Sequence, residues 1–313
     1  MFDALLNAFN GSVEQGLLYA FMALGVYISF RILDFPDLTV DGSFTTGAAV
    51  AAVLMTNGYS PYIATFGGFL AGCAAGAVTG LLHTKGKINN LLSGILMMIA
   101  LYSINLKIMG QANTPLFGQD TIISYIPESA LIWVMGVVVI IAKLLLDWFL
   151  HTEVGMALRA TGDNPKMIRS FGVNTDTTII TGISLSNGLV ALSGALVAQY
   201  QGFADLQMGV GMIVIGLASV IIGEALFGLK TVFRTTLAVV LGAIVYRFVL
   251  ALALEYNMDP AYMKLITALI VIIALTIPRI RKSIQQKKVA AERGRQLSST
   301  AGDSIQKGGG IRA

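Results

Sequence analysis

Long apolar runs separated by short polar intervals dominate this chain. Nine runs can be read along it, and several reach the roughly 20 residues that a helix needs to cross a bilayer. Only α-helices and closed barrels satisfy every backbone group in lipid, and these runs are too continuous for barrel strands. The pattern therefore predicts an all-α polytopic transmembrane helix bundle of about eight to nine spans. The runs are Val13–Leu33, Val40–Thr56, Pro61–Leu82, Leu91–Gly110, Ala130–Leu150, Ile179–Tyr200, Gly209–Phe227, Val232–Leu254 and Tyr262–Ile277.

The second run is the least regular of the nine. Val40–Thr56 is short and follows the polar string DFPDLTVDGS, so we expect a broken or partly re-entrant helix. Asp37, Asp41 and Ser43 are candidates for the lining of a translocation pathway, where an interrupted helix exposes its end to a solute. The alternative, which the sequence supports equally, is a loop in which Asp37 or Asp41 starts the helix as its N-cap.

Polar residues also open the fourth run. Asn89, Asn90 and Ser93 precede or begin its apolar stretch and are further candidates for the same pathway. Hydrogen bonding between neighbouring helices is the competing explanation for them.

The polar interval His151–Thr178 divides two strongly apolar runs and contains its own short helix signal. Asn164 or Asp163 suits the N-cap, Pro165 the first helical position, and Gly172 the left-handed residue after the end. Its apolar residues Met167, Ile168 and Phe171 fall at spacings that share one face. A helix of seven residues is marginal in water by itself, so we expect it to dock on another protein.

Composition and charge agree with a membrane protein. The chain is 55% hydrophobic and only 12% charged, about half the charge of a soluble domain. Lys and Arg occur in alternate connections, which indicates cytoplasmic loops by the positive-inside rule. This places the central loop and the C-terminus in the cytoplasm, with the N-terminus outside if all nine runs cross. We expect a transmembrane domain over 1–280 and a basic, unfolded cytoplasmic tail over 281–313.

A weak internal repeat appears when the chain is shifted by 168 residues. The motif F-x-D-L occurs at Phe35–Leu38 and again at Phe203–Leu206, and 203 − 35 = 168. The two copies begin five runs apart, and an odd number reverses the direction across the membrane. This pattern is typical of the inverted repeats of transporters. Chance similarity between apolar helices is the competing explanation.

The sequence lacks the residues of a catalytic or nucleotide site. No G-x-x-x-x-G-K-[ST] phosphate-binding motif occurs, so an ATP-dependent step would need a separate subunit. The histidines His83 and His151 and the single cysteine Cys73 make no plausible metal cluster. We therefore expect neither an enzyme nor a bound cofactor or metal.

The central loop resembles a known cytoplasmic motif. LRATGDNPKMIRSFGVNTD is similar to the loop of permeases of bacterial ABC importers of the branched-chain amino acid and ribose class, roughly R-A-x-G-x-N-x-x-x-A-x-x-x-G-I-N. The run KINNLLSGILMMIALYSINL and the GEALFGLKTVF region extend the similarity, and DFPDLTVDGSFTTGAA resembles a subgroup of amino-acid importers, some for aromatic amino acids. The residues that fit the motif are Arg159, Ala160, Gly162, Asn164, Gly172, Val173 and Asn174, and Arg169 departs from it.

The resemblance implies a homodimeric permease in the bacterial inner membrane. Each copy would carry one ATPase subunit on its cytoplasmic loop, and an extracellular or periplasmic binding protein would deliver a small solute, expected to be an amino acid. The helix Pro165–Phe171 would be the coupling helix. The coupling residues that this implies are Arg159, Gly162, Asp163, Asn164, Pro165, Met167, Ile168, Arg169, Phe171 and Gly172. The alternative is an ion-coupled secondary transporter, and the intramembrane carboxylates and the repeat would be the evidence for it.

Overall fold

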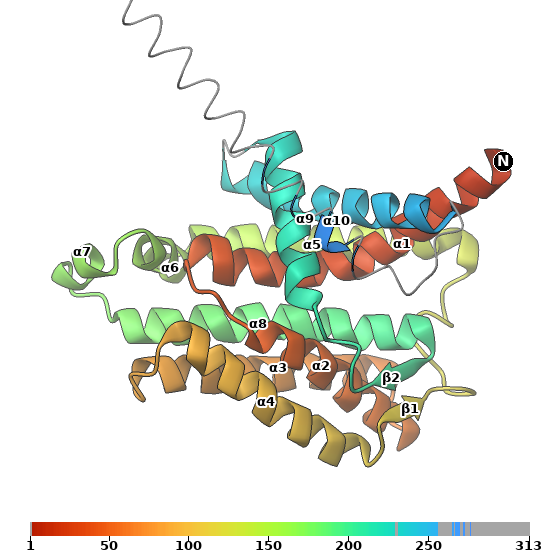
Figure 1. Cartoon of the computed structure of the whole chain (residues 1–313), viewed down its shortest axis with the longest axis horizontal. Helices are drawn as coiled ribbons and strands as arrows, with labels where there is room; N and C mark the ends of the chain where they lie inside the picture. The colour runs from red at the N-terminus through yellow and green to blue at the C-terminus, as the bar shows by residue number, and fades with distance from the viewer. Residues whose placement is uncertain are drawn as a thin grey trace, which may run out of the picture. The chain divides into compact units, whose positions relative to one another are not determined.

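The computed structural model is a bundle of long helices, with two short strands at one end (Figure 1). It describes residues 2–228 and 231–255, together with 265, 267–269, 272 and 276; within these, side chains are described from residue 9 onward except at 128 and 253–255. The ninth predicted run and the predicted tail therefore lie largely outside the described residues. The elements are α1 (Phe2–Val26), η1 (a π-helix, Tyr27–Ile32), α2 (Thr39–Thr56), α3 (Pro61–Thr84), α4 (Asn90–Met109), β1 (Asn113–Pro115), α5 (Glu128–His151), α6 (Glu153–Asp163), α7 (Pro165–Ser170), α8 (Thr175–Gln201), β2 (Phe203–Asp205), α9 (Met212–Phe227) and α10 (Val232–Glu255).

The all-α bundle predicted from the apolar runs is confirmed, but the number of spans was too high. Within the described residues, six helices are long and apolar enough to cross a membrane: α1 with η1, α3, α4, α5, α8 and α10. The predicted second and seventh runs are the shorter helices α2 and α9. A run of apolar residues does not reveal whether its helix starts at a membrane surface or within the bundle, which is why these two were counted as spans.

The prediction of a broken second helix is confirmed. The chain leaves η1 in an extended stretch and enters the bundle before α2 begins. Asp37, at the end of this stretch, is bonded to Asn187, the 13th of the 27 residues of α8. Because α8 is long enough to span the bilayer, this contact places the start of α2 near the middle of the bundle.

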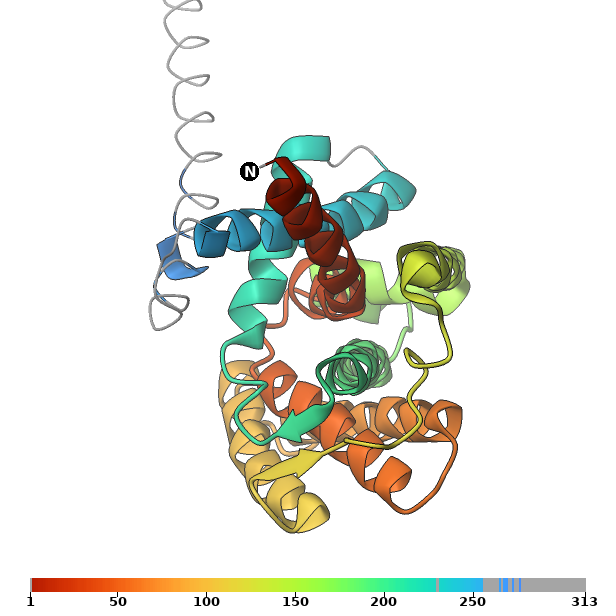
Figure 2. The same ribbon diagram turned by 90° about the vertical axis from the view of Figure 1, so that its right-hand side faces the viewer.

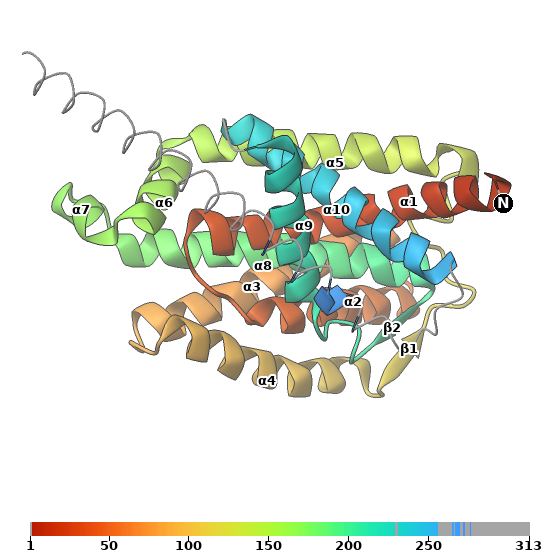
Figure 3. The ribbon, with the colours of Figure 1, turned by 45° about the horizontal axis from the view of Figure 1, so that its top comes forward.

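The two ends of the bundle differ in charge. The N-terminus and the β1–β2 pair lie at one end, and α6 and α7 lie at the other (Figures 1 and 3). Lys85, in the connection after α3, is 3.9 Å from Asp176 at the start of α8, so this basic loop shares the end that carries α7. The alternation of basic connections predicted this grouping.

Hydrogen bonds between α1 and α8 support the inverted repeat. The Ser186 hydroxyl donates to the Gly25 carbonyl at 2.7 Å, and the Ser193 hydroxyl donates to the Leu18 carbonyl at 2.8 Å. Since 186 − 18 = 168 and 193 − 25 = 168, the shift of 168 residues converts one bond into the other. Such an exchange is expected when two equivalent helices cross at a two-fold axis.

The connections that follow these helices repeat the same local geometry. The Asp37 carboxylate accepts from the Thr39 backbone N–H at 2.9 Å, and the Asp205 carboxylate accepts from the Gln207 backbone N–H at 2.7 Å. Both pairs differ by 168 residues. The repeat therefore relates α1, η1 and α2 to α8 and α9, with α5 as the additional helix that reverses the second copy.

The core forms around α8, which lies between α1 and the pair α2 and α3 when the bundle is viewed along its helices (Figure 2). Small residues let α3 approach α8 closely, as their spacing predicts. A methyl group added at any of these positions would lie within 3 Å of a neighbouring atom, in most cases one of α8: Gly68, Gly72, Gly76 and Gly80. This contact holds the helix that carries Asn187 against the first repeat.

Candidate functional site

The polar interval at the centre of the chain folds into two helices, α6 and α7. The Asn164 side chain accepts a hydrogen bond from the Met167 backbone N–H at 3.1 Å, and Pro165 is the first residue of α7. Gly172 follows with φ +85°, a conformation that glycine adopts without steric cost. The predicted short helix is present and ends at Ser170, with Phe171 as its C-cap. The preceding helix α6 was not predicted.

The apolar residues of α7 do not all point the same way. Met167 is 47% exposed and Phe171 is 74% exposed, whereas Ile168 is half-buried. The spacing of the three residues places them on one side of α7. However, α7 packs against α6 and α8, and this packing partly covers Ile168. Two large apolar side chains are therefore exposed on α7, the helix that projects from one end of the bundle (Figure 3).

Arg169 fastens α7 to the start of α8. Its Nε donates to the Thr175 hydroxyl at 2.5 Å, and its Nη2 is 3.3 Å from the Asp176 carboxylate. This residue departs from the family motif, and its contacts give it a local structural role. These two contacts restrict the movement of α7 relative to α8 and fix the direction in which α7 projects.

Gly162 fixes the other end of the loop against the bundle. A methyl group at this position would clash with the Ile32 carbonyl at the end of η1. At the preceding residue, the hydroxyls of Thr161 and Thr178 are 3.0 Å apart and join α6 to α8. The loop is therefore mounted rigidly on two helices that run through the bundle.

Asp37 is fully buried at the start of α2. Its carboxylate accepts from the Thr39 backbone N–H and, at 2.6 Å, from the Asn187 side-chain amide. The first bond holds the first backbone N–H of α2 and comes from the residue before the N-cap, which is Leu38. The second joins the two repeats at the middle of the bundle.

Asp41 caps α9, the helix of the second repeat that corresponds to α2. Its carboxylate accepts from the backbone N–H groups of Gly211 at 2.9 Å and Ile213 at 2.8 Å, at the N-terminus of α9. Gly209 lies against the Asp41 carbonyl so closely that a methyl group would clash, and 209 − 41 = 168. Asp41 and Gly209, the equivalent residues of the two repeats, are thus in contact near the starts of α2 and α9.

A cavity of about 420 Å³ lies beside this junction, between the start of α2, α4 and the segment before α9. Its wall is mainly apolar and includes Tyr102, and its polar members are Asp41, Thr45, Ser103 and Asn105. Asn105 is 1% exposed, and its side-chain oxygen has no hydrogen-bond partner among the described residues. An apolar cavity with a few polar groups is typical of a site for a small molecule.

The other predicted pathway residues are not gathered around this cavity. The Ser43 hydroxyl is buried one turn along α2 and has no partner among the described residues. At the start of α4, Asn89 accepts from the Leu91 backbone N–H, and Ser93 donates to the Asn90 carbonyl. Of the six predicted residues, Asp41 alone lines the cavity.

The sequence analysis missed a buried ion pair on α5. Lys143 and Asp147 are 2.6 Å apart, with 3% and 8% of their side chains exposed, and Lys143 lies over the ring of Phe233. The Thr236 hydroxyl of α10 donates to Asp147 at 2.7 Å. Two opposite charges four residues apart in an apolar run are the signal that would have revealed them. Asn105 and Asn187, single amides within apolar runs, give only a weak signal.

Comparison with known proteins agrees with these features. The sequence pattern of the family described as "Branched-chain amino acid transport system / permease component" matches residues 9–275. No solved structure gives a significant match.

Three relatives show the range of the family. A tyrosine transport system permease protein of Clostridioides difficile is 47% identical over 274 residues, covering 88% of this chain and 92% of the relative. The ribose import permease protein RbsC of Escherichia coli is 25% identical, with coverage of 88% and 86%. The autoinducer 2 import system permease protein LsrC of Salmonella paratyphi B is 27% identical, with coverage of 60% and 55%. The chain therefore belongs to the branched-chain amino acid permease family of ABC transporters.

Proposed function

We propose that this chain is the membrane subunit of an ATP-driven importer for an aromatic amino acid, with tyrosine as the first candidate. The tyrosine transport permease that is 47% identical to it supports this substrate class. The chain would work as a homodimer in the bacterial inner membrane, with its C-terminus in the cytoplasm. Family membership argues against the ion-coupled secondary transporter considered from the sequence.

The observation that carries the proposal is the mounting of α7. A short helix with two exposed apolar side chains, Met167 and Phe171, projects from one end of the bundle. Arg169 and Gly162 hold it against α8 and η1, so a force applied to α7 would reach the helices of the core. An ATPase subunit seated on α7 would use this path, and a second ATPase would seat on the partner copy.

The solute would pass near the junction of the two half-helices. The cavity beside Asp41 combines an apolar wall with an aromatic ring and an unpaired amide oxygen, which suits the body and the polar end of an aromatic amino acid. Asp37 and Ser43 would shape this junction, and Asn89, Asn90 and Ser93 would line the route toward the end that carries α7. An extracellular or periplasmic binding protein would deliver the solute at the opposite end.

Phe171→Asp tests the coupling. A carboxylate at this position would be desolvated in an apolar groove of the ATPase without a partner, so we expect loss of ATPase co-purification and loss of uptake of labelled tyrosine. The amount of permease in the membrane should not change, because Phe171 is exposed in the permease alone. Phe171→Leu is the matched control and should keep assembly, because it retains an apolar side chain.

Two results would contradict this proposal. If the Phe171→Asp complex assembles and shows ATP hydrolysis stimulated by the loaded binding protein, α7 is not the coupling element. If the unaltered complex assembles but takes up no aromatic amino acid, the substrate class is wrong and the coupling role stands.

A further inference from the structure

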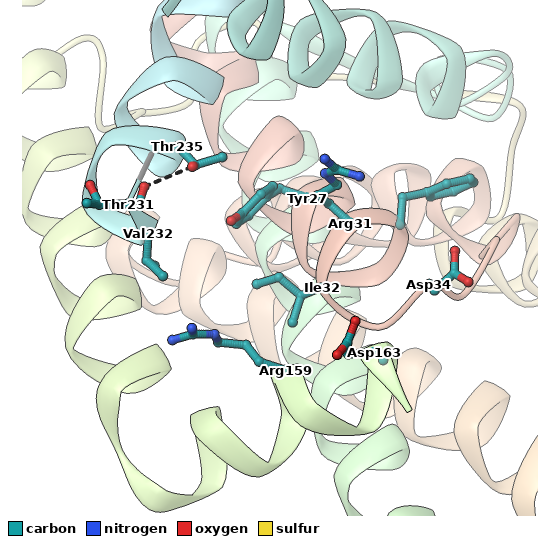
Figure 4. A pocket seen from close by; sticks show the side chains of 11 residues that line it. Tyr27, Arg31, Ile32, Asp34, Arg159, Asp163, Thr231, Val232 and Thr235 are labelled. Carbon is teal, nitrogen blue, oxygen red and sulfur yellow. Dashed lines mark hydrogen bonds between the residues drawn. The ribbon is translucent and has the colours of Figure 1, made fainter. Parts of the chain in front are cut away.

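A second cavity, of about 630 Å³, lies at the end of the bundle that carries α7 (Figure 4). Three separate parts of the chain form its walls: η1 together with Asp34, which follows it by two residues, the last two turns of α6, and the N-terminus of α10. Its volume is within the range of about 300–1,000 Å³ that is usual for small-molecule sites. Unlike the cavity beside Asp41, it is lined mainly by charged and hydroxyl groups.

Three charged side chains of this cavity have no hydrogen-bond or ion-pair partner among the described residues. Arg31 is occupied, because its Nε is 2.8 Å from the Glu224 carboxylate. Arg159, Asp34 and Asp163 make no hydrogen bond or ion pair with any residue that the structure describes. A cavity that keeps both signs of charge unpaired presents complementary groups to a ligand.

The charges are separated across the cavity. Figure 4 shows Arg159 on the same side as Thr231 and Val232, and the carboxylates of Asp163 and Asp34 toward the other side. Thr231 accepts from the Arg234 backbone N–H at 3.3 Å and so caps α10, whose N-terminus carries partial positive charge. The cavity therefore has a positive side, formed by Arg159 and the start of α10, and a negative side, formed by two aspartates.

This separation selects among ligand classes. A simple anion would be attracted by Arg159 and the N-terminus of α10 but repelled by the two carboxylates. A simple cation would be attracted by the carboxylates but repelled by Arg159. A zwitterion satisfies both sides, with its carboxylate at Arg159 and its ammonium group at Asp34 and Asp163. The Tyr27 ring is part of the wall and offers an aromatic surface to the remainder of the ligand.

The walls of the cavity also connect directly to α7. Arg159 and Asp163 belong to α6, which Asn164 alone separates from α7. A ligand bound here would join α6 to η1 and to α10. Since alternating access requires packed helices to move relative to one another, a ligand that fits one arrangement opposes the change to the other.

We propose that this cavity binds an α-amino acid from the side that carries α7 and thereby inhibits transport. By the orientation proposed above, that side is the cytoplasm, so the imported amino acid would slow its own uptake as it accumulates. This inference rests on the proposed function for the identity of its ligand. The assignment of a zwitterion site rests on the cavity itself.

The test uses the complete transporter in proteoliposomes with ATP inside and α7 facing the lumen. Preloading the lumen with unlabelled L-tyrosine should lower the initial rate of labelled tyrosine uptake by about fivefold or more, the usual size of an allosteric effect. Lumenal tyramine, which lacks the carboxylate, and 3-(4-hydroxyphenyl)propionate, which lacks the ammonium group, should not inhibit. Inhibition of equal strength by either compound would overturn the zwitterion assignment.

Asp34→Asn is the variant that separates this site from the coupling loop. Asp34 has φ +51°, and asparagine tolerates this conformation well, so the loop should keep its shape. Loss of the charge should raise the lumenal tyrosine concentration for half-inhibition about tenfold, while uptake into empty vesicles stays unchanged. Glu153→Gln removes a charge from α6 outside the cavity and should leave inhibition as it was.

Direct binding distinguishes failure of this inference from failure of the proposed function. Labelled L-tyrosine should bind the full chain in nanodiscs, and Asp34→Asn should weaken that binding about tenfold. Uptake without lumenal inhibition, or inhibition that Asp34→Asn does not change, overturns the regulatory site and leaves the importer intact. Binding that depends on Asp34 in a chain without tyrosine uptake supports the site and refutes the proposed transport function.

Discussion

Asp37 and Asp41 lie one helical turn apart and hold different parts of the structure. Asp37 accepts from the first backbone N–H of its own helix and from Asn187, whereas Asp41 caps α9, whose first residue, Met212, lies 212 − 41 = 171 residues later. Both carboxylates accept hydrogen bonds from N–H groups at the starts of helices. Each aspartate therefore has a structural role, in addition to any contact with a solute.

Asp41→Asn tests the cap on α9. The carboxylate accepts two backbone N–H groups with two oxygens, and an amide offers one oxygen and turns an N–H₂ group toward the other donor. We expect a loss of about 1.5–3 kcal/mol in the free energy of unfolding, the value of a hydrogen bond to a charged group. Thermal unfolding of the purified chain measures this loss. Uptake should also fall, because the contact between the starts of α2 and α9 is weakened.

Asp205→Asn provides the control for that measurement, since Asp205 is the equivalent of Asp37 in the second repeat. Its carboxylate accepts from the Gln207 backbone N–H at 2.7 Å and, at 3.4 Å, from the Asn113 side-chain amide. A single amide oxygen can keep the first bond, and the second is long and exposed. We expect little change in its unfolding temperature. Equal shifts for the two variants would show that the α9 cap contributes no special stability.

At the scale of elements, α5 is joined to α10 by charge rather than by small residues. Lys143 and Asp147 pair within α5, and the Thr236 hydroxyl links the pair to α10. The ring of Phe233, also on α10, covers the ammonium group. The additional helix between the two repeats is thus fixed to the second repeat by a buried polar cluster.

Lys143→Met should be strongly destabilising because it leaves Asp147 buried without its charge partner. Breaking one side of a buried pair costs about 3–5 kcal/mol, whereas replacing both sides with apolar residues is often neutral. The double variant Lys143→Met with Asp147→Leu should therefore recover much of the lost stability. The temperature of half-aggregation of the purified protein measures each variant, and a double variant worse than Lys143→Met would exclude this account.

Local chemistry predicted the elements better than it predicted their partners. Asn164, Pro165 and Gly172 define α7 through bonds to residues close in sequence, so the sequence contains the information. The bond from Gly211 to Asp41 depends on how two distant helices meet, and no local pattern encodes it. The half-buried position of Ile168 has the same origin, since the packing of α7 on its neighbours decides which edge is covered. The late start of α2 was predictable because polar residues precede it, but no such polar string marks the start of α9.

At the scale of the whole molecule, the inverted repeat explains why the functional features lie at different depths. Each copy contributes one long helix followed by a shorter one, and the two shorter helices, α2 and α9, begin next to each other. Within the described residues, α5, α6 and α7 are inserted between the copies. The junction proposed for the solute thus lies on the axis that relates the copies, and the proposed coupling helix lies at one end of the bundle.

The direction of the bundle in the membrane is testable because the chain contains a single cysteine. Cys73→Ala should be tolerated, since it removes one atom and leaves the Ser184 hydroxyl its bond to the backbone carbonyl of residue 73. In that background, Tyr59→Cys and Lys85→Cys add thiols at exposed positions on opposite ends of α3. We expect a membrane-impermeant maleimide to label Tyr59→Cys on intact cells and Lys85→Cys only after permeabilisation, with no label on the parent. The reverse result would put the basic connections and α7 outside the cell, where ATP-driven coupling through α7 has no energy source, and it would refute the orientation and the importer proposal together.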